Sequence, residues 1–148
     1  MIQNYIDLDT QLQPNGFDLT IGEVAEFTGR WPAIIDFSNK MRQISSTMPI
    51  LLEGGEYRLK PGMYLFRANE FFEMPDRLSG WGMPRSTLSR CGITLNSAII
   101  DAGYSGKLVF VVTISQETKF SKDARFCQMI FFKLNEAPSR LYDGVYKE

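Results

Sequence analysis

Two short stretches of the sequence carry residues that could bind and cleave a phosphorylated ligand. In the first, MPRSTLSRCG, Arg85 stands directly before the hydroxyls of Ser86 and Thr87. A guanidinium, two hydroxyls and the free backbone N–H groups of a helix start suit phosphate oxygens. The alternative is a capped helix, with Ser86 as its N-cap, beside a surface arginine. The motif alone does not decide between them.

The second stretch, IIDAGYSGKL, presents one carboxylate, Asp101, between an apolar pair and a glycine-rich turn. An aspartate with an ordinary pKa of ~3.9 is ionised at neutral pH, so it can orient and deprotonate a water molecule. Tyr104 lies between glycines and is free to offer its ring face to a planar or sugar-like ligand. The alternatives are a turn-forming aspartate and an ordinary aromatic residue at a barrel edge.

Gln128 raises a similar question, because its amide lies in the otherwise apolar run ARFCQMIFFKL and needs either a ligand or a backbone partner. The chain contains no histidine. This excludes Ser–His and Cys–His nucleophiles and removes the commonest general base. Cys91 and Cys127 are expected to be buried thiols rather than zinc ligands. Any catalysis must therefore rest on carboxylates and cations, with or without a bound metal ion.

The composition predicts one folded domain, residues 1–148, because 44% of the residues are hydrophobic and 22% are charged. With 16 basic and 17 acidic residues the net charge is -1, which offers no electrostatic surface for a nucleic-acid polymer. No stretch is apolar and long enough to cross a membrane, and the first residues do not resemble a secretion signal. We therefore expect a cytoplasmic protein.

The elements that position these residues are expected to be strands. Short runs rich in β-branched and aromatic residues, bounded by Gly, Pro, Asn or Asp, indicate an all-β barrel or sandwich; they cover residues 17–22, 23–29, 56–68, 92–100, 106–115 and 124–134. One short helix is predicted at residues 85–92, ending at Gly92. Residues 37–46 could form a further helical turn, or residues 36–56 could be a long surface connection. Residues 31–55 suggest no function.

The order of the motifs along the chain is specific. NGFDLTIG is followed by PRSTLSR, then by GITLNSAIIDAGYSG and finally by ARFCQMIF. This series resembles the superfamily of deoxyuridine triphosphatases and deoxycytidine triphosphate deaminases, over roughly residues 12 to 148, and looks closest to its archaeal-type triphosphatases. The resemblance implies a distorted jelly-roll β barrel, assembled as a homotrimer with each active site between subunits.

The resemblance also implies roles for individual residues. Asp101 would hold the attacking water and touch the sugar 3′-hydroxyl, and Tyr104 would pack under the deoxyribose. Residues 93–100 would form a hairpin that receives the pyrimidine. The remaining positions would hold the phosphates (Arg85, Ser86, Thr87, Gln128), lie near the base (Asn96, Ser97, Ala98, Ile99) or support the site (Asp18, Arg90).

One position separates the two branches of this superfamily. The glutamate that shuttles protons in the deaminase branch corresponds here to Val111, which cannot transfer a proton. Glu117 lies too far along the chain to replace it. The expected activity is therefore Mg²⁺-dependent hydrolysis of dUTP to dUMP and pyrophosphate, with Mg²⁺ held through the triphosphate and water. The alternatives are a dCTP deaminase, a bifunctional deaminase and triphosphatase, and a catalytically idle nucleotide-binding regulatory relative.

The C-terminus, RLYDGVYKE, lacks the glycine-rich tail with which the common triphosphatases cover the phosphates. Residues 138–148 could form a shorter lid that uses Tyr142, Tyr146 and Lys147, or they could be a frayed end. The sequence leaves both open.

Overall fold

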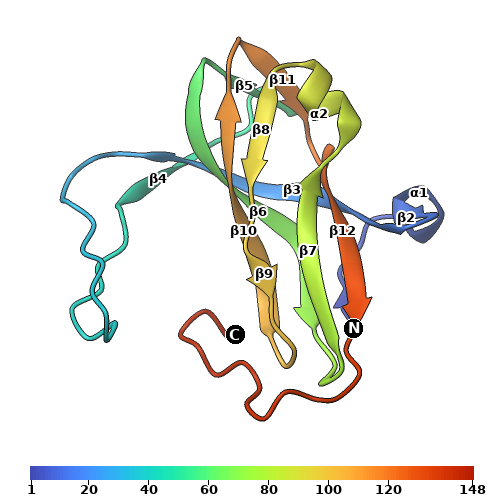
Figure 1. Ribbon diagram of the computed structural model, residues 1–148. Coiled ribbons are helices and arrows are strands. Elements are labelled where there is room, and N and C mark those ends of the chain that lie inside the picture. Colours follow the sequence, from blue (N-terminus) through green and yellow to red (C-terminus); the bar gives the residue numbers. More distant parts are fainter.

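Strand β10 (Ser105–Ile114) illustrates why this sequence folds into a curved sheet. Its buried residues alternate with more exposed ones along the whole strand, as expected when one face of a sheet covers a core. In the computed structural model, which describes residues 1–148, the main sheet is antiparallel, and Figure 1 shows how strongly it curls. Its strand order is β8 (Ile93–Asn96), β10, β6 (Gly62–Glu73), β3 (Gly16–Phe27), β12 (Arg125–Lys133), β7 (Leu78–Pro84) and β9 (Ile99–Ile100).

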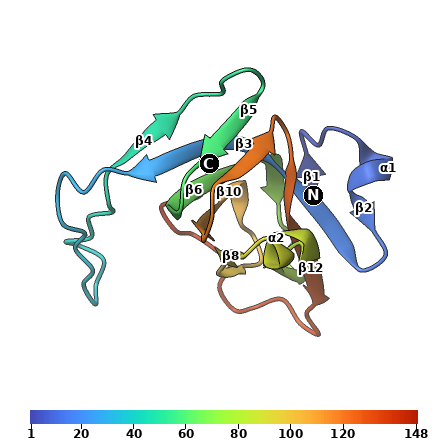
Figure 2. The same cartoon turned by 90° about the horizontal axis from the view of Figure 1, so that it is seen from above.

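The two edge strands explain how the sheet closes into a barrel. β8 and β9 are at opposite ends of the strand order, yet only residues 97 and 98 separate them along the chain. The segment that contains them therefore joins the two edges. Figure 2 shows the resulting barrel from above. The predicted all-β, distorted jelly-roll fold is confirmed.

The core inside the barrel contains a group of aromatic side chains that contact each other edge to edge. The ring of Phe126 makes edge contacts with Phe66 and Phe110, at centroid distances of 5.5 and 5.6 Å. Phe66 also contacts Phe120 at 5.3 Å. These rings belong to one cluster of 23 buried hydrophobic residues, so the side chains of the strands share a single apolar interior.

Smaller elements surround the barrel. β1 (Ile2–Gln3) pairs with β6, while β2 (Leu12–Gln13) and β4 (Thr47–Ile50) pair with β3. β5 (Glu56–Leu59) and β11 (Thr118–Ser121) form a separate ribbon. The helices are short, α1 (Leu8–Gln11) and α2 (Ser86–Arg90), and neither has the length or the apolar character that crossing a membrane requires.

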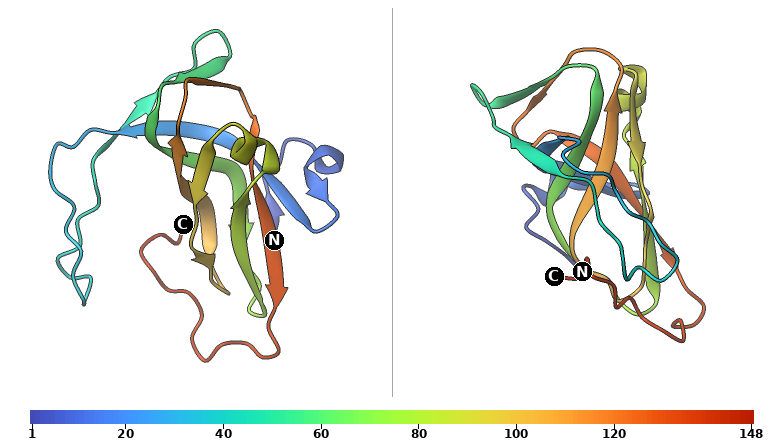
Figure 3. Two further views of the ribbon diagram at one scale, coloured as in Figure 1. Left: turned by 45° about the horizontal axis from the view of Figure 1, so that its top comes forward. Right: turned by 90° about the vertical axis from the view of Figure 1, so that its left-hand side faces the viewer.

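Residues 28–46 form an arm that projects from the barrel, as the left view of Figure 3 shows. The arm contains no helix, and its only ladder contact is the bridge between Ile34 and Gln43. The prediction of a surface connection over residues 36–56 is confirmed for residues 36–46 but is wrong for residues 47–50, which form β4. The alternative helical turn at residues 37–46 is wrong. Ile35 and Phe37 at its outer part are almost fully exposed, because no part of the same chain packs over them.

Each predicted run contains strand, but residues 17–22 and 23–29 belong to one strand, β3, and residues 56–68 and 92–100 each divide between two strands. The short strands β1, β2, β4 and β11 were not predicted, and neither was β7. Its sequence, LSGWGMP, contains two glycines and a proline, which indicate a turn when taken alone. Packing explains the glycines. A Cβ at Gly82 would lie 2.6 Å from Phe110 Cε1 and 2.9 Å from Cys127 Sγ, so the crowded core admits no side chain there.

Candidate functional site

Three neighbouring strands bring three of the polar candidate residues to one face of the sheet. Asp18 on β3 lies opposite Gln128 on β12, and Gln128 lies opposite Met83 on β7. Directly opposed residues in antiparallel strands point to the same face. Arg85 follows Met83 by two positions, so it continues on that face. Strand register therefore gathers residues from three distant parts of the sequence.

Asp18 is the centre of this arrangement. Its carboxylate is 2% exposed, and its Oδ2 atom lies 2.9 Å from Arg85 Nε and 3.2 Å from Arg125 Nη1. Burial raises the pKa of Asp18, while the two guanidiniums act in the opposite direction and favour its ionised form. The supporting role expected for Asp18 thus has a structural basis in two ion pairs.

Helix α2 begins at Ser86, which is one residue earlier than it would begin if Ser86 were its N-cap. Arg85 occupies the N-cap position without a capping side-chain hydrogen bond, and Ser86 is the first helical residue. The prediction of Ser86 as the N-cap is therefore wrong. The side chains of Ser86 and Thr87 are exposed instead, beside the Arg85 guanidinium. The predicted end of the helix is confirmed, because Gly92 has a φ of +69°, a conformation that glycine adopts without strain.

The Gln128 side chain is half-buried and makes no hydrogen bond within the chain. The alternative of a backbone partner is therefore not realised, and the amide remains available to a ligand. Arg90 at the other end of α2 is exposed and forms no ion pair. Within one chain, Arg90 therefore makes no ion pair that would explain its expected supporting role.

Residues 93–100 do not form the expected hairpin. β8 pairs with β10 and β9 pairs with β7, so the segment crosses between two strands instead of pairing with itself. The reason is that these strands are the two edges of the curled sheet. Gly82 N donates to Ser97 Oγ across the crossing, at 3.3 Å.

A shallow groove of about 430 Å³ lies beside this crossing. Its lining contains no carboxylate and no cation; it consists of Trp81, Gly82, Met83, Pro84, Leu95, Asn96 and Ser97. Asn96, Ala98 and Ile99 are exposed near it, and Ser97 is half-buried. The arrangement offers apolar surface and backbone groups, which suit a planar ring better than a charged ligand.

Asp101 opens a turn at the far end of β9. Its backbone oxygen accepts a hydrogen bond from Tyr104 N at 3.2 Å, and Gly103 has a φ of +80°, as the third residue of a type II turn requires. The turn-forming alternative for Asp101 is confirmed. Its side chain is nevertheless exposed and takes part in no ion pair, so the carboxylate is free to act on a ligand.

Tyr104 is not free to present its ring, contrary to the sequence interpretation. It is 8% exposed, its hydroxyl donates to Lys107 O at 2.9 Å, and the Tyr142 ring packs edge-on against it at 5.3 Å. Burial raises the pKa of Tyr104 to about 12. Tyr142 from the C-terminal segment covers Tyr104, and the sequence around Tyr104 could not indicate this contact.

The C-terminal segment lies along the Asp101 turn and not over Arg85, and Figure 1 shows it running beneath the end of the barrel opposite α2. Tyr142 N donates to Ala102 O at 2.9 Å, and Glu148 pairs with Arg67. The exposed Tyr146 ring lies 5.3 Å from the Arg42 guanidinium of the arm. These contacts attach residues 142–148 to the barrel of the same chain, and we call this segment the strap. Lys147 within it is exposed.

Within one chain, Arg85 and Asp101 lie at opposite ends of β7. Ile100 pairs with Gly80, so Asp101 lies near the start of β7, while Arg85 follows its end. Six residues of strand at about 3.3 Å each separate their backbones by roughly 20 Å. The phosphate-binding candidates and the candidate general base therefore do not meet within a single copy.

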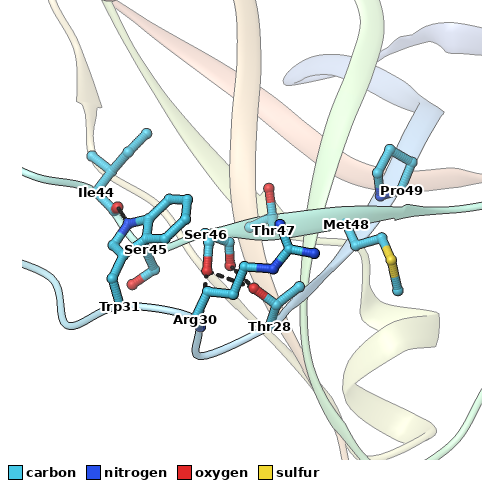
Figure 4. Close-up of a pocket in the computed structure, with 9 residues that line it drawn as sticks. All are labelled: Thr28, Arg30, Trp31, Ile44, Ser45, Ser46, Thr47, Met48 and Pro49. Atoms are coloured by element: carbon cyan, nitrogen blue, oxygen red, sulfur yellow. Dashed lines mark hydrogen bonds between the residues drawn. The ribbon is translucent and has the colours of Figure 1, made fainter.

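A second hollow, shown in Figure 4, lies in the arm among Thr28, Arg30, Trp31 and Ser46. Its hydroxyls bond to each other, with Thr28 Oγ1 and Ser46 Oγ 2.5 Å apart, and Arg30 N donates to Ser46 Oγ at 3.1 Å. It contains no carboxylate. These satisfied polar groups stabilise the base of the arm and provide no group for catalysis.

Sequence reasoning missed Arg125. It precedes the apolar part of β12 and looks like an ordinary strand-end cation in the sequence. Its proximity to Asp18 arises only from the pairing of β3 with β12. The chain has no cluster of three or more His, Cys, Asp or Glu side chains that could hold a metal ion.

Comparison with known proteins identifies relatives of this arrangement. Residues 1–134 match the dCTP deaminase-like family. The probable deoxyuridine 5′-triphosphate nucleotidohydrolase of Methanococcoides burtonii is 39% identical over 99% of this chain and 87% of its own length. The deoxyuridine 5′-triphosphate nucleotidohydrolase of Methanocaldococcus jannaschii is 30% identical over 94% of this chain and 88% of its own length.

Among solved structures, the 2′-deoxycytidine 5′-triphosphate deaminase from Agrobacterium tumefaciens superposes with a TM-score of 0.66. The match covers 88% of this chain and 41% of that chain, at 21% sequence identity. At this identity the likeness establishes the shared barrel fold.

Proposed function

Because this chain belongs to the dCTP deaminase-like family and to its branch of deoxyuridine 5′-triphosphate nucleotidohydrolases, we propose that it hydrolyses dUTP to dUMP and pyrophosphate. The observation that carries the proposal is Arg85, held on the buried carboxylate of Asp18 next to the exposed hydroxyls of Ser86 and Thr87. It supplies positive charge and hydrogen-bond donors for a phosphate chain. The groove at residues 95–97 then accepts the base.

In the proposed reaction, Arg85, Ser86, Thr87 and Gln128 hold the phosphates. Asp101 orients a water molecule and removes its proton while the water attacks the α-phosphate. Positioning and electrostatic stabilisation then supply most of the rate, because phosphoryl transfer needs little covalent chemistry from the protein.

Mg²⁺ fits this proposal only as an ion that binds together with the substrate, through the substrate phosphates. The chain offers no three-ligand cluster, and Mg²⁺ commonly binds through substrate phosphates and retains several waters. A bound Mg²⁺ would offset phosphate charge. The chelator EDTA should therefore suppress dUTP hydrolysis, and added Mg²⁺ should restore it.

We also propose that the active enzyme is a homotrimer in which Arg85 of one copy faces Asp101 of the next. The separation of roughly 20 Å between their backbones supports this, since no single chain completes the site. The exposed apolar side chains of the arm support an assembly as well, because monomeric soluble proteins rarely expose such patches.

The family name and the deaminase structure make dCTP deamination the second candidate. Val111 is half-buried in the middle of β10, opposite Asn96 and Leu65, and no neighbour in this register is an acid. The groove beside Asn96 contains no titratable side chain either. Loss of the proton-transfer group removes a contribution of about 10²–10⁴-fold, so these observations favour hydrolysis.

A substrate panel tests the proposal. The purified protein is incubated separately with dUTP, dCTP and dTTP, and released pyrophosphate and ammonia are both measured. We expect pyrophosphate from dUTP far in excess of the other two substrates, and no ammonia from dCTP. Ammonia from dCTP without pyrophosphate from dUTP would overturn the assignment in favour of a deaminase. Absence of both products would indicate the idle regulatory alternative.

Arg85→Ala separates phosphate recognition from base recognition. It should weaken binding of dUTP far more than binding of deoxyuridine, because only the former carries phosphates. Glu117→Gln is a suitable control, since it removes a carboxylate from an exposed ion pair with Arg58, and such pairs contribute little to stability. Equal losses for both ligands would argue against the phosphate role of Arg85.

A further inference from the structure

Arg125 shares the carboxylate of Asp18 with Arg85. Both guanidiniums approach the same oxygen, Oδ2, and both arginines remain partly accessible, with side chains 31% and 27% exposed. Arg85 Nη1 also lies 3.4 Å from Arg125 O, so the two residues are in direct contact. A pair of accessible arginines on one buried carboxylate leaves one positive charge uncompensated, and this charge can attract a further anion.

The hydrogen bonds that the arginines already make determine which donors remain free. Arg85 uses Nε for Asp18, and its Nη2 atom has no partner. Arg125 uses Nη1 for Asp18 and for Thr10 O, at 3.2 and 2.9 Å, and its Nε and Nη2 atoms have no partner. Each guanidinium is thus held by Asp18 at one of its edges. Its unused N–H groups lie at its other edges.

The charge of the cluster points to an anionic ligand. Two guanidiniums and one carboxylate leave a surplus of one positive charge beside the exposed hydroxyls of Ser86 and Thr87. Arginine donates in a planar fork that matches phosphate oxygens. A phosphate chain would satisfy both the unused donors and the surplus charge.

A buried network fixes the backbone oxygen that holds Arg125. Thr10 precedes Gln11, which is 1% exposed; Gln11 Oε1 accepts from Ile6 N and Asp7 N, at 2.7 and 3.0 Å. Gln11 Nε2 donates to Asp18 O and to Glu70 Oε1, at 2.8 and 2.7 Å.

Glu70 is fully buried and extends the same network into the core. It accepts hydrogen bonds from Thr20 N and Thr20 Oγ1 in addition to the Gln11 amide. A buried polar network in which each group is satisfied is rigid. The N-terminal turn therefore presents Thr10 O to Arg125 in a fixed position.

We propose that Arg125 is a second phosphate-binding residue, which grips the triphosphate together with Arg85 while Asp18 and Thr10 O set the orientation of its guanidinium. The inference rests on the proposed function and deepens it by adding a residue that recognises the phosphate chain. Asp18 is then a positioning residue, because it acts on the ligand through the two arginines.

Calorimetric binding of inorganic triphosphate and of deoxyuridine tests this. Arg125→Ala should weaken triphosphate binding by about tenfold to hundredfold, the value of one or two charge-assisted hydrogen bonds, and leave deoxyuridine binding unchanged. Arg58→Ala is the matched control, since it removes an exposed arginine from a surface ion pair. Triphosphate affinity within about twofold of wild type, or an equal loss for deoxyuridine, would overturn the proposal.

Two further variants keep the test decisive if Arg125→Ala does not fold. Arg125→Lys retains the charge without the planar fork and should bind triphosphate with intermediate affinity. Asp18→Asn raises the net positive charge of the cluster but releases both guanidiniums. Positioning predicts weaker triphosphate binding for Asp18→Asn, whereas charge alone predicts stronger binding, and the latter result would contradict the inference.

The binding assay also separates this inference from the proposed function. If wild-type protein releases no pyrophosphate from dUTP but binds triphosphate through Arg125, the hydrolase proposal fails and the phosphate site stands. If dUTP is hydrolysed and Arg125→Ala binds triphosphate like wild type, the hydrolase stands and the role of Arg125 fails.

Discussion

The Arg85 end and the Asp101 end of the barrel are built in different ways. At the Arg85 end, strands β3, β12 and β7 place Asp18, Gln128 and Arg85 on one face, and ion pairs to a buried carboxylate orient the arginines. At the Asp101 end, a single turn carries an exposed carboxylate without an ion partner, and the C-terminal segment straps the turn in place.

The difference indicates a division of labour. The proposed phosphate-binding half is preorganised by contacts inside one chain, so it would lose little entropy when a ligand binds. The half that would supply the general base has its geometry set by a turn and by the C-terminal segment, and its carboxylate has no ion partner. Under the proposed function, catalysis depends on bringing together two copies of the chain. The following experiments test each end of the barrel and the relation between them.

The largest expected effect comes from Asp101→Asn. Removing the general base should lower turnover of dUTP by about 10²–10⁴-fold, because an amide cannot take the proton from water. Binding of dUTP, which depends on the other end of the barrel, should change little. Pyrophosphate release and calorimetric binding measure the two quantities separately. Wild-type turnover in this variant would refute the role of Asp101.

Mixing two inactive variants tests whether the ends meet between copies. Asp101→Asn and Arg85→Ala chains are co-expressed so that mixed assemblies form. If each site takes Arg85 from one copy and Asp101 from another, random mixing restores about a quarter of the sites. If both residues act within the same chain, the mixture stays as inactive as its components. The pyrophosphate assay distinguishes these results directly.

Gly82→Ala should damage the Arg85 end by shifting β7. The added Cβ would meet Phe110 Cε1 at 2.6 Å, and overpacking of this kind costs about 1–3 kcal/mol of unfolding free energy. Gly62→Ala is the matched control, because a Cβ there would make only ordinary contacts at 3.5 Å or more. Denaturant unfolding measures both. Equal stability of the two variants would show that β7 tolerates a shift.

The smallest effect is expected from removing residues 142–148 at the Asp101 end. Burial holds the pKa of Tyr104 at about 12 instead of the ordinary 10.0. This raised pKa favours the neutral phenol in the folded state, so its contribution to stability is complete below pH 10 and is lost as the pH rises through about 12.

Truncation should expose Tyr104 and lower its pKa toward 10.0, because it removes the Tyr142 ring and the Glu148 charge. Tyrosinate absorbance at 295 nm is followed against pH in the full-length and truncated proteins. Subtracting the curve of the matching Tyr104→Phe variant from each isolates the titration of Tyr104. The fully exposed arm residue Phe37 provides a control, since Phe37→Ser should leave the tyrosine titration as it is. An unchanged Tyr104 titration after truncation would show that the strap does not bury this residue.

Much of the fold was predictable from the sequence, and the errors have physical causes. The runs that became β3, β6, β10 and β12 were recognised because they are rich in β-branched and aromatic residues and are bounded by turn residues. Burial alternates along β6 and β10, whereas β3 contains five consecutive buried residues. β7 was missed because Gly82 is a glycine for reasons of core packing, which depends on Phe110 and Cys127 from distant strands. Likewise, the pairing of β8 and β9 with different partners reflects how the whole sheet curls.

The sequence by itself determined the strand-forming segments, the absence of histidine chemistry and the presence of two separate polar motifs around Arg85 and Asp101. These properties depend on residue type and local periodicity. Only the tertiary structure decided that Arg125 joins Arg85 on Asp18, that Tyr142 covers Tyr104, and that Asp101 lies far from Arg85. Each of these is a contact or a separation between residues remote in sequence, set by strand register and barrel closure, which no local pattern encodes.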